Sequence, residues 1–110
     1  MLTVMSFGFK FGTPRADHVI DCRDIVNPHR HPKYKPLTGL NKAVQDYVMA
    51  DRKAQNILRE ASELYLKDGK IVAFGCLGGR HRSVALAEKF AALATERGLT
   101  VRVIHRELSA

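Results

Sequence analysis

The distribution of apolar and polar positions along the chain predicts four strands. Apolar and β-branched residues dominate residues 2–9 and 18–23, and both runs end in turn-forming or polar residues, as strands commonly do. Residues 71–74 are continuously apolar, which is typical of a buried strand in a parallel sheet. Residues 100–105 alternate between polar and apolar side chains, a pattern that predicts the last strand.

Apolar residues recur at helical spacing over residues 40–66 and again over residues 81–97. Asp51 is a favourable N-cap residue, so we expect the first stretch to be broken into two helices near it. Residues 27–36 contain three prolines, which exclude a helix or a central strand and predict an extended basic loop.

This order of elements predicts an α/β fold, because the last strand, helix and strand form a right-handed unit with parallel strands. A chain of 110 residues has room for one core. We therefore expect residues 1–110 to form a single small three-layer domain with a mostly parallel sheet of about four strands. Ligand sites in such sheets lie at the carboxyl ends of the strands, which here lead into the loops after Cys22 and Phe74.

Composition adds a hint about partners. Eighteen Lys and Arg against eleven Asp and Glu give a net charge of +7, which favours a polyanionic or phosphorylated partner, although net charge of either sign also keeps a small domain soluble. No apolar run approaches the ~20 residues that cross a membrane, and the start of the chain does not have the pattern of a secretory signal. We expect a soluble, cytoplasmic protein without a membrane partner.

The segment Gly75-Cys76-Leu77-Gly78-Gly79-Arg80-His81-Arg82-Ser83 joins a predicted buried strand to a predicted helix. Its glycines let backbone N–H groups turn toward one point, and the helix start adds a positive dipole. Arg82 offers a planar set of donors for a phosphate, and Ser83 adds a hydroxyl. The sequence is not a Walker A loop and lacks the spacing of a dinucleotide-binding turn. It predicts a strand–glycine loop–helix phosphate site; the alternative is a turn that only connects the two elements.

The same loop has the C-x-x-x-x-x-R-[ST] spacing of cysteine-dependent phosphatases, with Cys76 as nucleophile and Arg82 as phosphate ligand. Two features argue against catalysis: Gly75 stands where those enzymes usually have histidine, and the sequence does not assign an aspartate as the general acid. Asp21 is the one carboxylate we would place near the loop, and it is the candidate acid if the protein is a phosphatase. Cys76 is otherwise a small half-buried residue at a strand end.

Other candidates are weaker. Asp21 and Arg23 end the second strand and would face the same crevice. His29 and His31 form a pair without a third ligand, so we expect no metal site and no cofactor, and these histidines suit anion contacts or a solvated loop. The two cysteines do not form a disulfide framework.

Several sequence blocks resemble the C-terminal domain of the RapZ family of RNase adaptor proteins. They are Ser6–Lys10, Asp21–Arg23, Asn27–His29, Pro36–Leu40, Gly75–Val84 and His105–Arg106. The resemblance implies a domain that senses glucosamine-6-phosphate, self-associates and takes part in presenting a small regulatory RNA to an endoribonuclease. It implies a sugar-phosphate pocket made of Asp21, His29, Gly78, Gly79, His81, Arg82 and Ser83, to which the loop positions Leu77 and Arg80 are added. It also implies RNA contacts at Lys10 and Arg23.

The chain departs from the family in three ways. Residues 1–110 contain no Walker A motif, position 77 is leucine where the family commonly has threonine, and we expect no basic tail of the kind that follows the last strand in RNA-binding members. These departures predict a stand-alone domain that keeps the pocket. The hydroxyl missing at position 77 bears on sugar selectivity, and the expected absence of the tail bears on the adaptor role.

The sequence thus favours a non-catalytic regulatory or adaptor domain that binds a phosphorylated metabolite, such as a sugar phosphate, with RNA as a second partner. The alternative is a small phosphatase that uses Cys76, Arg82 and Asp21. A module that binds only RNA is less favoured, because Phe7, Phe9, Phe11 and Tyr34 are too few for a stacking platform and suit the core better.

Overall fold

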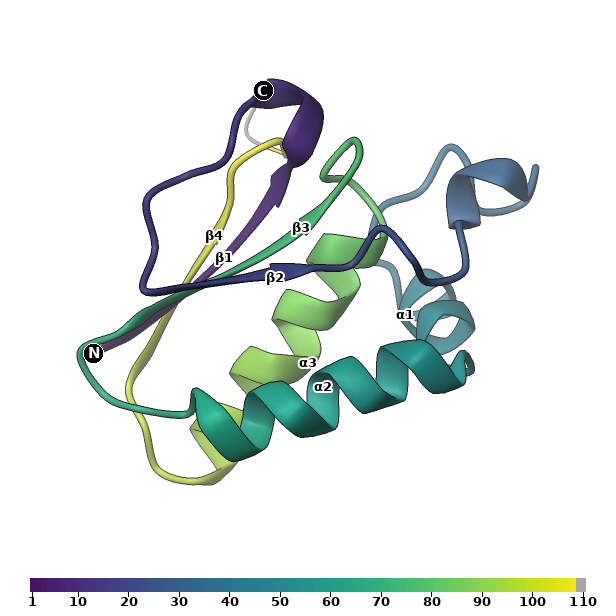
Figure 1. The fold of residues 1–110 in the computed structure, drawn as a ribbon. Helices are drawn as coiled ribbons and strands as arrows, with labels where there is room; N and C mark the ends of the chain where they lie inside the picture. Colours follow the sequence, from purple (N-terminus) through teal and green to yellow (C-terminus); the bar gives the residue numbers. More distant parts are fainter. Residues whose placement is uncertain (109–110) are drawn as a thin grey trace.

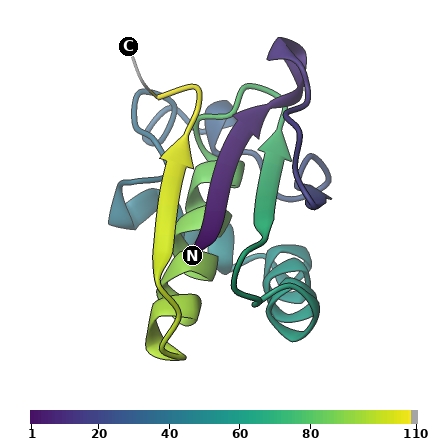
Figure 2. The same ribbon diagram turned by 90° about the vertical axis from the view of Figure 1, so that its left-hand side faces the viewer.

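A sheet of four parallel strands forms the centre of the fold in the computed structural model, which describes residues 1–108. The strands are β1 (Leu2–Gly8), β2 (His18–Asp21), β3 (Ile71–Cys76) and β4 (Val101–His105). Their order across the sheet is β2-β3-β1-β4, so the earliest strand lies between the two latest (Figures 1 and 2).

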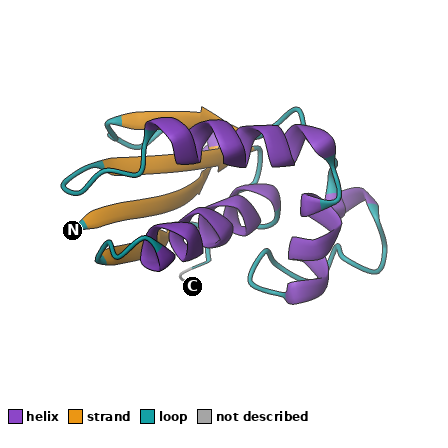
Figure 3. Cartoon of the chain, turned by 90° about the horizontal axis from the view of Figure 1, so that it is seen from below, coloured by secondary structure: helices purple, strands orange, loops and turns teal. Residues whose placement is uncertain are grey.

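Three helices pack on one face of this sheet: α1 (Lys42–Met49), α2 (Arg52–Leu64) and α3 (Arg82–Glu96). Helix α3 lies on β1, β3 and β4, whereas α1 and α2 pack against α3 and against each other. Figure 3 shows the strands on one side of the molecule and the helices on the other. The structure confirms the α/β class, the parallel four-stranded sheet and the layered arrangement, with α3 on the face of the sheet and α1 and α2 packed against α3.

Side-chain caps explain why the helical stretch is broken where the sequence predicts it. The Asp51 carboxylate accepts a hydrogen bond from the Lys53 N–H at 2.9 Å and another from the Val26 N–H at 2.7 Å. Asn41 caps α1 in the same way through the Ala43 N–H at 2.9 Å. Each cap satisfies a donor that the helix cannot pair internally, so α1 and α2 begin at defined residues.

The core lies between the sheet and α3. Phe74 of β3 and Phe90 of α3 are fully buried, and their ring centroids are 5.3 Å apart. Leu2 and Val4 of β1 and Leu86 of α3 complete its centre. The apolar periodicity of residues 81–97 therefore identifies the buried face of α3 correctly.

Two single-turn 3-10 helices differ from the sequence prediction. Phe9, the last residue of the first predicted strand, instead begins η1 (Phe9–Phe11), and η2 (Pro28–Arg30) lies inside the loop for which the prolines predict no helix. That exclusion is wrong for one turn: Pro28 occupies its first position, where no N–H is needed, and the Asn27 side chain accepts from the His29 N–H at 3.2 Å. No helix within residues 1–108 is long and apolar enough to cross a membrane.

Candidate functional site

Four segments far apart in the sequence enclose a groove of about 840 Å³ at the carboxyl ends of β1 and β3. Residues 76–82 supply the glycine loop, η1 supplies Lys10 and Phe11, and the chain after β4 supplies Arg106 and Glu107. The proline-containing loop closes the groove with Asn27, His29, Pro32, Lys35 and Pro36. The parallel sheet thus brings the groove to the edge where the sequence predicts a site.

The glycine loop needs glycine at position 79. Gly79 has φ +75°, a conformation that residues with a side chain rarely adopt. A Cβ atom there would also lie 2.5 Å from the Gly8 N and 2.7 Å from the Phe7 C. The loop is therefore packed directly against the end of β1.

Backbone donors of this loop are free to bind an anion. Within residues 1–108, the N–H groups of Gly78, Arg80, His81 and Arg82 have no protein acceptor. His81 is the N-cap of α3 and its side chain does not cap the helix. Because the first N–H groups of a helix carry a partial positive charge, α3 presents unpaired donors and a favourable dipole to the groove.

Arg82 lies in the wall of the groove with its side chain nearly buried. Its Nη1 donates a hydrogen bond to the Arg23 carbonyl at 2.8 Å, which fixes the guanidinium beside the loop. A guanidinium has five N–H donors, so this bond leaves others for a ligand.

Cys76 is held by the loop itself. The Gly79 N–H donates to its Sγ at 3.3 Å, and its thiol donates to the Ser83 Oγ at 3.2 Å. Ser83 is fully buried behind the thiol and does not line the groove. Gly75 precedes Cys76 for a packing reason, because a Cβ atom there would lie 2.4 Å from the Phe7 Cζ.

Asp21 and Arg23 lie outside the groove lining, as a surface ion pair. Arg23 donates from Nη2 to Oδ2 of Asp21 at 2.8 Å and from Nε to Oδ1 at 3.0 Å, and its guanidinium lies 4.0 Å from the Phe9 ring centroid. The hydrogen bond from Arg23 holds the pKa of Asp21 below its usual value. Asp21 is therefore a charged acceptor rather than a stored proton.

The histidines divide between two places. His29 and His81 both line the groove, with ring centroids 6.0 Å apart, whereas His31 packs against Tyr34 at 4.7 Å. The His81 Nε2–H donates to the Tyr34 carbonyl at 3.2 Å, and burial lowers the pKa of His81. Over residues 1–108, no three His, Cys, Asp or Glu residues come together as metal ligands.

Sequence reasoning did not assign a site role to Arg106 or Glu107. The Glu107 carboxylate accepts from the Gly8 N–H at 2.8 Å and from the Arg106 Nε at 2.9 Å, and Arg106 also donates to the Gly12 carbonyl at 2.6 Å. No spacing in the sequence signals them, because only the pairing of β4 with β1 brings them to the groove.

Phe11 and Lys35 were missed for different reasons. Phe11 was expected in the core, but 59% of it is exposed at the groove. Lys35 belongs to the basic loop for which the sequence predicts anion contacts, but nothing in the sequence distinguishes it from the other lysine there.

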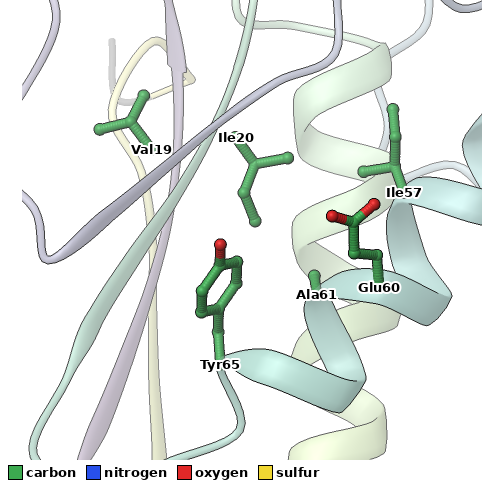
Figure 4. A pocket seen from close by; sticks show the side chains of 6 residues that line it. All are labelled: Val19, Ile20, Ile57, Glu60, Ala61 and Tyr65. Atoms are coloured by element: carbon green, nitrogen blue, oxygen red, sulfur yellow. The ribbon is translucent and has the colours of Figure 1, made fainter.

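A second pocket of about 200 Å³ lies between β2 and α2 (Figure 4). Its lining is mainly aliphatic, with Glu60 and Tyr65 as the polar contributors. It contains none of the residues that the sequence singled out.

Comparison with known proteins gives one consistent result. The sequence matches the family model of the RapZ C-terminal domain over residues 1–109. A nucleotide-binding protein of Thermobifida fusca is 45% identical over 116 residues, which are 96% of this chain and 40% of the relative. A nucleotide-binding protein of Streptomyces griseus is 43% identical over 117 residues, 96% of this chain and 35% of the relative. The chain thus spans 40% or less of the length of these two relatives.

Proposed function

Because this chain belongs to the RapZ C-terminal domain family, we propose that it is a non-catalytic binding domain for a phosphorylated metabolite, with a regulatory or adaptor role. One observation carries the proposal: unpaired N–H groups of the glycine loop and the Arg82 guanidinium line the same groove. Together they form a cradle suited to a phosphate group.

The charges around the cradle support an anionic ligand. Lys10, Lys35, Arg80 and Arg106 line the groove, and Glu107 is the one carboxylate among its lining residues. That carboxylate is already bound by the Gly8 N–H and by Arg106, which offsets its repulsion of an anion.

We propose a sugar phosphate as the ligand class, with glucosamine-6-phosphate as the first compound to test. Its phosphate would bind Leu77, Gly78, Gly79, Arg80, His81 and Arg82 through the loop, and His29 would contact the sugar. Asp21 and Ser83 would act from outside the groove, Asp21 through Arg23 and Ser83 through Cys76.

RNA is proposed as a second partner, with Lys10 and Arg23 as phosphate contacts. Lys10 is exposed in the lining of the groove, and the relatives from Thermobifida fusca and Streptomyces griseus are named nucleotide-binding proteins. Self-association and a single domain over residues 1–110 belong to the same proposal.

Calorimetric titration with inorganic phosphate and with glucosamine-6-phosphate tests the site. Replacing Arg82 by alanine should weaken binding by about 1.5–3 kcal/mol, the range for a charge-assisted hydrogen bond. Arg59→Ala, an exposed arginine of α2 outside the groove, is the matched control and should bind as the parent does. Equal affinity of Arg82→Ala and the parent would place the ligand elsewhere.

The alternative function is that of a cysteine-dependent phosphatase. The spacing of Cys76 and Arg82 favours it, together with the Gly79 N–H bond that holds the Cys76 sulfur inside the glycine loop. The buried thiol and the ion-paired state of Asp21 favour binding without catalysis.

A further inference from the structure

We infer that the groove takes a nucleoside 5′-phosphate, with the phosphate in the glycine loop and the base stacked on Phe11. This inference rests on the proposed function, because it needs the phosphate site, and it assigns a nucleoside in place of the hexose of glucosamine-6-phosphate.

The size of the groove exceeds what a hexose phosphate needs. A volume of about 840 Å³ lies in the upper part of the range of about 300–1,000 Å³ for pockets that enclose drug-sized ligands. One sugar ring and one phosphate would leave much of this space to solvent. A second ring system attached to the sugar would fill it.

The rim of the groove is apolar on the side of η1. Phe11 is 59% exposed and Leu77 is 55% exposed, and both line the groove. Sugar hydroxyls gain little from such side chains, whereas the face of a planar base removes them from water. These two residues therefore favour a ligand that is polar at one end and aromatic at the other.

Phe11 is held in a fixed place relative to the phosphate cradle. The Lys10 N–H donates to the Leu77 carbonyl at 3.2 Å, which ties η1 to the glycine loop. Arg106 donates to the Gly12 carbonyl at 2.6 Å, directly after Phe11. The backbone on both sides of Phe11 is thus anchored by hydrogen bonds, so a stacked base costs little backbone conformational freedom at this position.

Lys10 adds to the stacking site. Its Nζ lies 5.1 Å from the Phe11 ring centroid, within the range of a cation–π contact. Base stacking on aromatic side chains tolerates every base, so we expect affinity for the nucleotide class rather than for one base.

The experiment compares adenosine 5′-monophosphate, uridine 5′-monophosphate, ribose 5-phosphate and inorganic phosphate by calorimetry. Adenosine 5′-monophosphate should bind about 5–150-fold more tightly than ribose 5-phosphate, the gain from one stacked base. Phe11→Ala should abolish this gain without changing ribose 5-phosphate affinity, and Phe11→Tyr should retain it. Because Phe11 is exposed, these variants should fold as the parent does.

The outcomes separate the two proposals. If adenosine 5′-monophosphate and ribose 5-phosphate bind with equal affinity and Arg82→Ala weakens the binding of both, the phosphate site is confirmed and the base site is wrong. If neither compound binds, or if Arg82→Ala binds them as tightly as the parent does, the proposed function and this inference are both wrong. A 5′-phosphorylated RNA trinucleotide and its dephosphorylated form extend the comparison. If the phosphorylated trinucleotide binds more tightly than the free nucleotide, the ligand that supplies the nucleoside 5′-phosphate is the 5′ end of an RNA.

Discussion

At the scale of single residues, the Cys76 thiol is held between the Gly79 N–H and the Ser83 hydroxyl. We expect no phosphatase turnover from it, because general acid catalysis commonly contributes about 10²–10⁴-fold and the charged Asp21 is bound to Arg23. Cys76→Ser should bind inorganic phosphate with similar affinity, and neither protein should hydrolyse an aryl phosphate. Burial raises the pKa of Cys22, so this second thiol would not act as a substitute nucleophile. If the parent hydrolyses the aryl phosphate and Cys76→Ser does not, the protein is a cysteine-dependent phosphatase.

His81 gives the protein a pH dependence in the acidic range. Burial lowers the pKa of His81 in the folded state, so the unfolded chain, with a pKa of about 6.5, takes up the proton at higher pH. The contribution of neutral His81 to the free energy of unfolding is complete above about pH 6.5, and it is lost as the pH falls through the folded pKa of His81. Denaturant unfolding at pH 7.5 and 5.5 should show a smaller pH effect for His81→Gln than for the parent. An equal effect in both proteins would assign the dependence to other groups.

Much of the groove could be predicted residue by residue, because one loop supplies its centre. The loop residues 77–82 and His29 do line it. Asp21 and Ser83 do not, since strand pairing and burial decide where those side chains lie. A site role for Arg106 and Glu107 could not be predicted from the sequence, because the positions of these residues depend on the register of β4 against β1.

At the scale of elements, the glycine loop depends on Gly79 both for its conformation and for its approach to β1. Gly79→Ala should cost more than the ~1–2 kcal/mol of a left-handed residue, since its Cβ also meets the backbone of Gly8 and Phe7. Gly98→Ala is the matched control: its φ is +86°, but nothing lies within 4 Å of an added Cβ. Chemical denaturation should rank Gly79→Ala below Gly98→Ala in the free energy of unfolding. Equal losses would mean that the contact with β1 adds nothing.

The longer elements were predictable because several turns repeat one pattern and polar caps define where they start. The caps at Asn41 and Asp51 are examples. The 3-10 helices η1 and η2 contain a single turn each, which is too short to produce a periodicity. The position of Phe11 follows from η1, so the sequence could not distinguish it from a core residue.

At the scale of the whole molecule, the net charge of +7 governs any contact with RNA. We expect RNA affinity to fall steeply as salt rises, because binding releases counterions from the phosphates. Lys10→Ala should reduce the slope of log K against log salt by about one, for RNAs of different sequence alike. Lys67→Ala, an exposed lysine outside the groove, should reduce it less. Filter binding at several salt concentrations measures this, and a nearly salt-independent affinity would contradict it.

The strand order has a consequence for how the chain is made. β1 leaves the ribosome before both of its neighbours, since β3 and β4 are encoded far downstream. At a synthesis rate of about 5–20 residues per second, β1 waits about 3–12 s before β3 begins to emerge. During that time an apolar strand has two unpaired edges, which is the situation in which nascent chains associate with one another. β1 is thus the strand that waits longest for a hydrogen-bonding partner, because β2, the other strand that waits for β3, is synthesised later.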